Sequence, residues 1–376
     1  MQRMSRYIYQ KKDWPNFTWD INALFSIHSE ARNLQGKLLG KMESLGFEFQ
    51  TEAILDNYTL DVLKSTEIEG EFLNPEQVRS SVARKLGVEI AGSIESDRNV
   101  DGMVEMMLDA TQNSFKPLST GRLFAWHSAL FPSGKSGMYQ IIVGDWRQDT
   151  TGPMQVVSGA LGKEKVHFQA IDSENINAEV QLFLEWFNTN HSIDLLIKAA
   201  VAHLWFVTIH PFEDGNGRIT RAITDMLLSR SDNSSQRFYS MSAQIRVERK
   251  GYYEILEKTQ KGNLDLTDWI EWFLNCLVNA LKATDELLNK VLFKANFWKK
   301  HAMTTFNDRQ TKMLNKLLDG FDGKLTSSKW AKISKCSKDT AIRDIQDLIK
   351  KEVLMKEAEG GRSTNYEFKK IVNVIF

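Results

Sequence analysis

The sequence predicts a mainly α-helical protein, and three observations support this fold class. Apolar residues recur three and four positions apart along most of the 376 residues, which is the period of an α-helix. One short stretch breaks this pattern and indicates a β-hairpin. The final part of the chain places two short strands after three helical segments. A chain of this length can hold about two or three domains, and the pattern divides it at 1–95, 96–297 and 298–376.

Composition and charge favour no particular class of partner. The chain has 48 Lys and Arg, 48 Asp and Glu, and 42% hydrophobic residues. Its two cysteines, Cys276 and Cys336, form neither a CxxC nor a Cys/His spacing, so we expect no disulfide framework and no structural zinc site. The start, MQRMSRYIYQKKDW, lacks the apolar core of a signal peptide. We therefore expect a cytoplasmic protein that does not enter a membrane.

Two helices are expected in residues 1–95. The first begins at Asp20, which can cap it, and Gly46 can end it. The second lies in TEAILDNYTLDVLKSTEIEGEF, whose apolar residues form one stripe, and it ends near Gly70, with Pro75 just beyond. This part is therefore expected to be all-helical.

Helices are also expected to dominate residues 96–297. Their ranges are Val104 to Phe115, Gly121 to Leu130, Asn177 to Asn188, Ser192 to His210 and Asn216 to Ser229. The exception is GPMQVVSGALGKEKVHFQA, where two β-prone runs, Met154 to Val157 and Val166 to Phe168, flank a glycine-rich turn. Because two strands alone are marginal in water, this hairpin needs a partner or a functional role.

The last part, 298–376, resembles a winged helix-turn-helix. Helices are expected at Asp308 to Leu318, Ser327 to Ser334 and Lys338 to Lys351, and strands at Val353 to Glu357 and Tyr366 to Lys369, around the turn Glu359-Gly-Gly-Arg-Ser. From residue 304 onward, 15 Lys and Arg face 10 Asp and Glu. This local excess is consistent with DNA contact, and a protein-interaction or dimerisation module is the alternative.

The segment IHPFEDGNGRITR, from Ile209 to Arg221, joins two predicted helices. Gly215, Asn216 and Gly217 permit a tight bend whose N–H groups can converge on an anion at the start of the second helix. Two guanidinium groups, from Arg218 and Arg221, lie on nearly one face of that helix and can hold further phosphate oxygens. The pattern therefore predicts a polyphosphate site.

Two further residues of the segment indicate catalysis. A carboxylate beside phosphates, Asp214, makes physical sense when Mg²⁺ lies between them. His210 lies at the end of the preceding helix, and its ordinary pKa is suited to taking a proton from an attacking hydroxyl. Each residue alone has an ordinary structural explanation, whereas the whole set predicts a catalytic site.

The segment from His210 to Arg221 resembles a known signature. HPFEDGNGRITR is similar to HxFx(D/E)GNGRxxR of the Fic family, with every specified position present. The resemblance covers about residues 60–280 and implies a Fic helical core that moves AMP from ATP to a hydroxyl side chain of a target protein, releasing pyrophosphate.

By this resemblance each residue of the signature acquires a role. His210 would be the base, and Asp214 would hold Mg²⁺ against the α- and β-phosphates. The turn Gly215 to Gly217 would cradle the phosphates, with Asn216 on the α-phosphate. Arg218 and Arg221 would bind the β- and γ-phosphates.

The resemblance also assigns the hairpin and a later helix. The hairpin would be a flap that aligns the target segment, with Val156 and its neighbour Val157 as the hydrophobic contact. In YYEILEKTQKGN, Tyr253, Leu256 and Gln260 would flank the nucleoside. Gln260 stands where asparagine is common in the family, and Tyr253 and Leu256 have an alternative interpretation as core positions of an amphipathic helix.

A second family feature lies in the first part of the chain. Ser65-Thr-Glu-Ile-Glu69-Gly70 matches the (S/T)xxxE(G/N) motif of Fic proteins that inhibit themselves. On a helix, Ser65 and Glu69 share a face. The resemblance implies that Glu69 pairs with Arg221 and takes the place of the γ-phosphate. The alternative is a Ser/Glu face that is merely solvated.

Several alternatives stay open from the sequence. Glu69 is a candidate for activating a water that removes AMP from a modified target, and the phosphate site alone permits transfer of another phosphate-containing group. A different class of function is a DNA-binding regulator whose Fic core senses nucleotide. The expected partners are ATP, a target protein with a Ser, Thr or Tyr hydroxyl or the protein itself, and DNA in the regulator hypothesis, with a homodimer as a further expectation.

Overall fold

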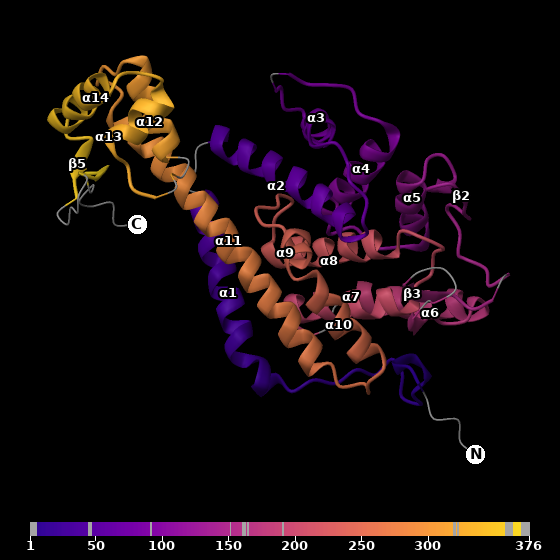
Figure 1. Cartoon of the computed structure of the whole chain (residues 1–376). Coiled ribbons are helices and arrows are strands. Elements are labelled where there is room, and N and C mark those ends of the chain that lie inside the picture. Colours follow the sequence, from indigo (N-terminus) through magenta and orange to yellow (C-terminus); the bar gives the residue numbers. More distant parts are fainter. Residues whose placement is uncertain are drawn as a thin grey trace. The chain divides into compact units, whose positions relative to one another are not determined.

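The computed structural model describes residues 6–43, 47–90, 92–150, 152–159, 163, 165–189, 192–318, 321, 323–357 and 364–369. It divides into two compact units, Met1–Thr284 and Asp285–Phe376. The division falls within one long helix, α11 (Thr267–Lys300), as does the boundary expected near residue 297. Helices make up most of the described chain (Figure 1), so the predicted fold class is confirmed.

The first unit consists of helices with two small antiparallel hairpins. Its helical elements, besides the first part of α11, are η1 (Ile8–Gln10), α1 (Ile21–Glu43), α2 (Phe47–Ile68), α3 (Pro75–Leu86), α4 (Arg98–Gln112), α5 (Thr120–Leu130), η2 (Ser173–Asn175), α6 (Ile176–Asn188), α7 (Leu195–Ile209), α8 (Asn216–Asp232), α9 (Met241–Val247) and α10 (Arg249–Gln260). The hairpins pair β1 (Lys135–Ser136) with β2 (Tyr139–Gln140), and β3 (Gln155–Ser158) with β4 (Lys165–Gln169).

Helix α7 is the centre of the first unit. Nearly all of its side chains are buried, including the apolar residues on every side of the helix. It packs against α8 and α6. Hydrogen bonds join it to α10, from His203 to Tyr252, and to α11, from the Trp269 ring N–H to the Ala200 carbonyl. A helix buried all round needs no polar face. The two helices that meet at the predicted catalytic segment therefore lie in the buried core of the unit.

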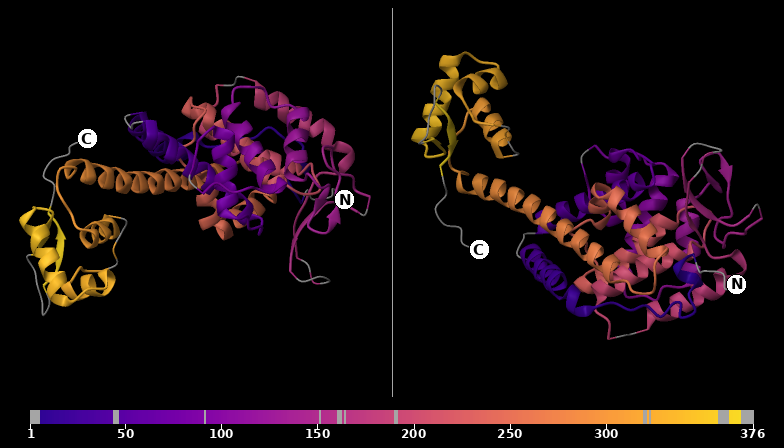
Figure 2. Two further views of the ribbon diagram at one scale, coloured as in Figure 1. Left: turned by 90° about the horizontal axis from the view of Figure 1, so that it is seen from above. Right: turned by 60° about the horizontal axis from the view of Figure 1, so that its bottom comes forward.

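The amino-terminal helices follow the expected caps, with one helix added. Asp20 Oδ1 accepts hydrogen bonds from the N–H groups of the first turn of α1, and Gly70 has φ of 87° just after α2. Residues 44–46, where α1 was expected to end at Gly46, lie outside the described residues. The sequence analysis did not predict α3, which begins with Pro75 behind an Asn74 cap. Helix α1 runs beside the first part of α11 (Figures 1 and 2), joined by a Glu30–Lys282 ion pair of 2.7 Å.

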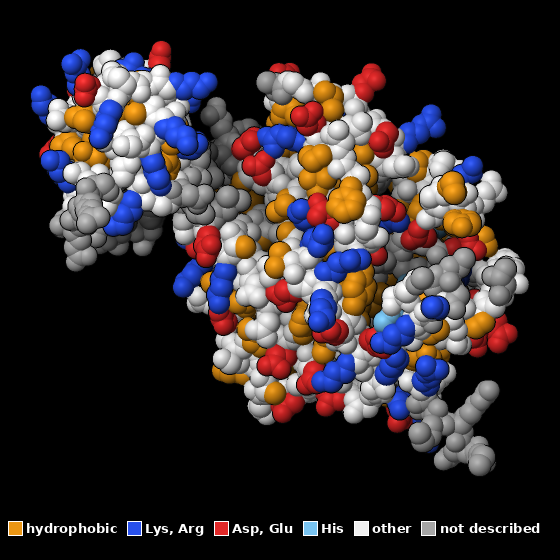
Figure 3. Space-filling view, viewed as in Figure 1, with side chains coloured by type: hydrophobic (Ala, Val, Ile, Leu, Met, Phe, Trp, Pro, Cys, Tyr) orange, Lys and Arg blue, Asp and Glu red, His pale blue; other side chains and the backbone are white. Residues whose placement is uncertain are grey.

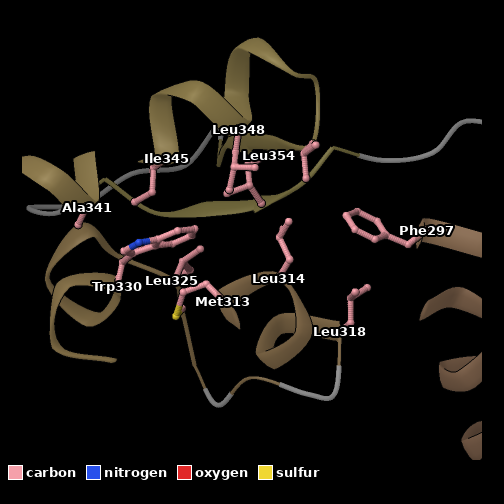
Figure 4. Close-up of a cluster of buried hydrophobic side chains, with 11 residues drawn as sticks. Phe297, Met313, Leu314, Leu318, Leu325, Trp330, Ala341, Ile345, Leu348 and Leu354 are labelled. Carbon is pink, nitrogen blue, oxygen red and sulfur yellow. The ribbon is translucent and has the colours of Figure 1, made fainter. Parts of the chain in front are cut away.

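The second unit has its own hydrophobic core. Its elements after α11 are α12 (Asp308–Leu318), α13 (Ser327–Ser334), α14 (Lys338–Lys350), β5 (Leu354–Lys356) and β6 (Tyr366–Phe368). Met313, Trp330, Ile345 and Leu354 meet in this core (Figure 4). The expected order of three helices and two strands is confirmed, whereas the turn at 359–363 lies outside the described residues. The winged helix-turn-helix interpretation stays a prediction.

No helix in the described part of the chain is both long enough and apolar enough to cross a membrane.

Candidate active site

The bend between α7 and α8 has the backbone geometry that its sequence predicts. His210 ends α7 in the left-handed conformation, with φ of 52°. Gly215 has φ of 81°, and α8 begins at the next residue, Asn216. A Cβ on Gly215 would lie 2.9 Å from a ring carbon of Phe131. Glycine is therefore required here both for the backbone conformation and for the close approach of the ring.

His210 is held as a neutral base. Its Nδ1 lies 3.2 Å from the carbonyl oxygen of Val207. A carbonyl only accepts, so Nδ1 carries the proton and Nε2 keeps its lone pair. Burial lowers the pKa of His210 to about 4. Arg147, which the sequence analysis missed, donates from Nε to the His210 carbonyl at 2.8 Å and so fixes the backbone of the bend.

The first turn of α8 opens into a cavity. Gly215, Asn216 and Gly217 line it, and among the described residues no side chain caps this helix. Uncapped N–H groups and the helix dipole make such a terminus a site for an anion. The Asn216 side chain instead bonds to both backbone groups of Phe212, at 3.0 and 2.7 Å. Asn216 thus braces the loop, and its backbone N–H is the group available to a phosphate.

A second brace is His127 of α5, which sequence reasoning missed. Its ring stacks on Phe212 with centroids 4.2 Å apart. Nε2 donates to the carbonyl oxygen of Asp214 at 3.2 Å, and Nδ1 accepts from the N–H of Gly144 at 3.1 Å. Burial lowers its pKa to about 4. A neutral imidazole with hydrogen bonds at both nitrogens therefore ties the loop between α7 and α8 to α5.

Asp214 presents a carboxylate to the cavity. Its side chain is 39% exposed, its Oδ1 accepts from the N–H of Gly215 at 2.5 Å, and its Oδ2 accepts from the hydroxyl of Ser136 on β1. The neighbouring Glu213 instead accepts a hydrogen bond at Oε2 from the backbone N–H of Ile142, at 2.7 Å. The described residues contain no cluster of three or more acidic, His or Cys ligands. A single protein carboxylate such as Asp214 is compatible with Mg²⁺ binding, because Mg²⁺ commonly takes its other ligands from phosphates and water.

Both arginines of the signature are buried and engaged by the segment that ends α2. Arg221 Nε donates to the Ser65 hydroxyl at 2.7 Å, and its Nη2 donates to the Ser65 carbonyl and to Glu69 Oε1, each at 2.8 Å. Arg218 Nη1 lies 2.8 Å from Glu71 Oε2. Ser65 and Glu69 were predicted from the (S/T)xxxE(G/N) motif, whereas Glu71 lies outside it and was not predicted.

These contacts keep the arginines away from the cavity. Its volume is about 800 Å³, and its lining includes Glu69 but neither Arg218 nor Arg221. Gly217 lies directly under Glu69, since a Cβ there would be 2.1 Å from Glu69 Oε1. Gly70, in the left-handed conformation, turns the chain from Glu69 toward Glu71. The end of α2 thus covers the place where the arginines would meet a ligand.

The residues expected at the nucleoside come together on α10. Tyr253, Leu256 and Gln260 all line the cavity. Gln260 Nε2 donates to the Thr208 hydroxyl at 3.2 Å, which fixes its amide against α7. Arg249 was missed; it lines the same cavity and donates from Nε to the carbonyl oxygen of Ile68 at 2.8 Å. The α10 wall is therefore tied directly to the end of α2.

The hairpin β3–β4 forms another wall of the cavity. Val156 faces Phe168 of β4, and Val157, 47% exposed, faces Val166, with an irregular register between the two valines. Both valines line the cavity. Within the described residues β3 pairs with β4 alone, so its other edge carries unpaired N–H and C=O groups. The hairpin that the sequence left without a partner thus borders the site.

A helical core whose central bend holds a histidine, an open helix terminus and two arginines defines the class of protein. Residues 117–228 match the Fic/DOC family. Residues 7–88 match a domain of unknown function, DUF4172. The site therefore brings together the arginines of one matched segment and Ser65, Glu69 and Glu71 of the other.

Particular relatives carry the same family name. The chain is 27% identical over 179 residues to a protein adenylyltransferase fic-1 from Caenorhabditis elegans, covering 47% of this chain and 32% of the relative. It is 33% identical over 104 residues to a protein adenylyltransferase Fic from Drosophila virilis, covering 27% and 20%. The matches thus span about a third or less of these relatives.

A solved structure has the same fold along nearly the whole chain. A Fic family protein from Desulfovibrio desulfuricans aligns with a TM-score of 0.53 and 19% identity, over 94% of this chain and 98% of that one. At this identity the likeness concerns the fold alone.

Proposed function

We propose that this protein is an autoinhibited adenylyltransferase that moves AMP from ATP to a hydroxyl side chain of a target protein. One observation carries the proposal: the neutral imidazole of His210, whose Nε2 accepts no hydrogen bond from the described residues, lines the same cavity as the terminus of α8. The names of the curated relatives support the choice of AMP as the group transferred.

His210 supplies the base. Its Nε2 takes the proton of the target hydroxyl while the hydroxyl oxygen bonds to the α-phosphorus. The bond from that phosphorus to the oxygen bridging to the β-phosphate breaks, and pyrophosphate leaves. Because the pKa of His210 lies near 4, the imidazole is in the acceptor form at neutral pH. The hydrogen bond to Val207 keeps the ring in the required tautomer.

The terminus of α8 and Asp214 hold the triphosphate. Backbone N–H groups at Asn216 and Gly217 donate to phosphate oxygens. Asp214, half-exposed with oxygen ligands to offer, would hold Mg²⁺. When bound, Mg²⁺ neutralises charge on the phosphates and on the leaving pyrophosphate. Tyr253, Leu256 and Gln260 form the wall for the nucleoside.

Inhibition follows from the pairing of both arginines. Arg221 and Arg218 would bind the β- and γ-phosphates, but Nε and Nη2 of Arg221 and Nη1 of Arg218 are engaged by Ser65, Glu69 and Glu71. A phosphate that approached them would meet two carboxylates of the same sign of charge. The end of α2 must therefore move before the triphosphate binds in its productive position.

The hairpin presents the target. An extended segment of the target can pair with the unpaired edge of β3, while Val156 and Val157 supply the apolar contact. Pairing of this kind places one residue of the segment at a fixed distance along the strand. The target hydroxyl is thereby brought to the cavity that contains His210.

The experiment uses the full chain with Mg²⁺ and ATP labelled at the α-phosphate, alone and with a cell lysate. Three proteins are compared: wild type, Glu69→Gly, and Glu69→Gly with His210→Ala. Protein labelling that rises in Glu69→Gly and disappears with His210→Ala is expected. If Glu69→Gly binds ATP and labels nothing, including itself, the transferase proposal fails.

A second candidate function, DNA binding, is favoured by one observation in the second unit. The exposed face of α14 carries Lys338, Arg343 and Lys350, with Asp339 as its exposed acid. Lys and Arg cover much of the face of this unit seen in Figure 3. Neutralising Lys338 and Arg343 together should weaken binding to duplex DNA and reduce its salt dependence. Unchanged binding, or none by the wild type, would exclude this function.

A further inference from the structure

A second group of hydrogen-bonded polar side chains lines the cavity that the signature borders. Ser158 of β3, His167 of β4 and Glu257 of α10 form a chain of two hydrogen bonds. The Ser158 hydroxyl and His167 Nε2 are 2.6 Å apart, and His167 Nδ1 lies 2.6 Å from Glu257 Oε2. All three residues line the cavity that also contains His210. Nothing in the proposed transfer to a target uses them.

With the imidazole neutral, the chemistry of the three groups sets the donor and acceptor of each hydrogen bond. The Glu257 carboxylate only accepts, so His167 Nδ1 carries a proton. In the neutral ring Nε2 then has a lone pair, which accepts the hydrogen bond that the Ser158 hydroxyl donates. A carboxylate orients the imidazole, and the imidazole accepts a hydrogen bond from the serine. This is the arrangement of an activated nucleophile.

A neighbouring lysine, Lys261, favours the ionised form of the Glu257 carboxylate. Lys261 Nζ lies 2.5 Å from Glu257 Oε1. Its hydrogen bond, together with that of His167, lowers the pKa of Glu257 to about 2, so the orienting group is a carboxylate at neutral pH. Ser158 itself is exposed, so a ligand in the cavity can reach its hydroxyl.

We propose that Ser158 is a self-modification site that accepts the nucleotidyl group of a nucleotide bound in the cavity. The inference rests on the proposed function, because the donor is the ATP held at the terminus of α8. The Ser158 oxygen bonds to the α-phosphorus, the bond from that phosphorus to the oxygen bridging to the β-phosphate breaks, and pyrophosphate leaves. The serine proton passes to His167 Nε2 and then to solvent.

The modified serine would change the docking wall. A phosphodiester at position 158 adds a negative charge and a nucleoside to the end of β3, where the target segment is expected to pair. Self-modification would therefore compete with modification of targets.

The test maps the modified residue in the full chain. Glu69→Gly protein is incubated with Mg²⁺, labelled ATP and lysate, and its peptides are sequenced by mass spectrometry. AMP on Ser158 is expected; it should disappear in Ser158→Ala and persist in Ser158→Thr. Glu257→Gln preserves shape but offers an amide N–H to His167, which favours the wrong tautomer, so the rate at Ser158 should fall by about 100-fold or more.

The outcomes separate this inference from the proposed function. Labelled lysate proteins with an unmodified Ser158 would overturn the self-modification site and leave the transferase standing. No labelling of any protein would overturn both. Labelling of Ser158 at an unchanged rate in Glu257→Gln, with ATP binding intact, would overturn the role of the three-residue chain.

Discussion

The carboxylate of Glu71 lies 2.8 Å from Nη1 of Arg218. Glu69 pairs with Arg221, which follows Arg218 by three residues. One three-residue segment, Glu69 to Glu71, thus pairs with both guanidinium groups of the Fic signature. The Arg218 side chain is only 6% exposed, so its charge is satisfied largely by this contact, by Asp214 at 3.5 Å and by the ring of Phe131.

Glu71→Gln should therefore raise the affinity for ATP. The change removes one charge that competes with phosphate for Arg218. A partly exposed pair of this kind contributes about 0.2 to 1 kcal/mol, which corresponds to about a 1.4- to 5-fold lower Kd. Calorimetric titration with MgATP measures it. Glu67→Gln is the matched control, because Glu67 pairs with Lys64 and Arg246 and contacts neither Arg218 nor Arg221. Equal effects of the two variants would contradict the assignment.

Gly217→Ala should displace the Glu69 carboxylate, since the new Cβ would lie 2.1 Å from its Oε1. Loss of the buried charge-assisted bond to Arg221 should lower the free energy of unfolding by about 1 to 2 kcal/mol. In a Glu69→Gly background the same change should cost less, because the nearest obstructing group is gone and Arg221 Nη1 lies 3.2 Å from the new Cβ. Denaturant unfolding of the four proteins gives the coupling.

Gly121→Ala serves as the control for the glycine change. It lies in α5 with nothing within 4 Å of its would-be Cβ, so it should be neutral or slightly stabilising in both backgrounds. Additive costs for Gly217→Ala would show that Glu69 does not occupy the space over Gly217.

The activity of Glu69→Gly should not depend on the titration of an ordinary histidine. Because the pKa of His210 is lowered to about 4, its base form already predominates above about pH 5. The pH profile of kcat/KM should therefore show no acid limb near the usual histidine value of about 6.5. Such a limb in the free enzyme would contradict the neutral, hydrogen-bonded imidazole.

The buried His203 should make stability depend on pH. Burial lowers its pKa to about 3, and its nitrogens bond to the hydroxyls of Thr224 and Tyr252. Below a pH of about 6.5 the unfolded chain takes up a proton there that the folded chain refuses, so stability falls as the pH falls. Between about pH 7.5 and about pH 5 this residue alone should cost about 2 kcal/mol.

His203→Gln removes that titration and keeps a hydrogen-bonding side chain. The difference in unfolding free energy between the two pH values should therefore shrink by about 2 kcal/mol relative to wild type, whatever the absolute stability of the variant. An unchanged difference, measured by urea unfolding, would show that His203 is protonated in the folded protein.

The local features of the site were predictable from the sequence, and the long-range contacts were not. Glycines at 215 and 217 and the helical period on either side predict the bend, and the motif predicts Glu69 near Arg221. Glu71 escaped notice because it belongs to no motif. Ser158 and Glu257 are ninety-nine residues apart, and only the hairpin register together with the packing of α10 brings them to one histidine.

Short or boundary elements were missed for a related reason. Helix α3 has few buried apolar residues, so its period is weak, and its start depends on the Asn74 cap and Pro75. The first turns of α4 precede the range that was expected, and begin at an Asp97 cap. Helix periodicity alone does not locate such ends; the hydrogen-bonding side chains at the caps do.

The covalent connection between Glu69 and the two arginines has a consequence for how the proposed inhibition should respond to concentration. Because the carboxylates and the arginines belong to one folded unit of one chain, the fold fixes the effective concentration of the proposed inhibitor. Dilution of the protein leaves that concentration unchanged, whereas ATP, which competes for the same guanidinium groups, varies freely. The degree of inhibition should therefore follow the ratio of ATP to a constant that the fold itself sets, and be the same in a dilute and in a concentrated solution of the protein.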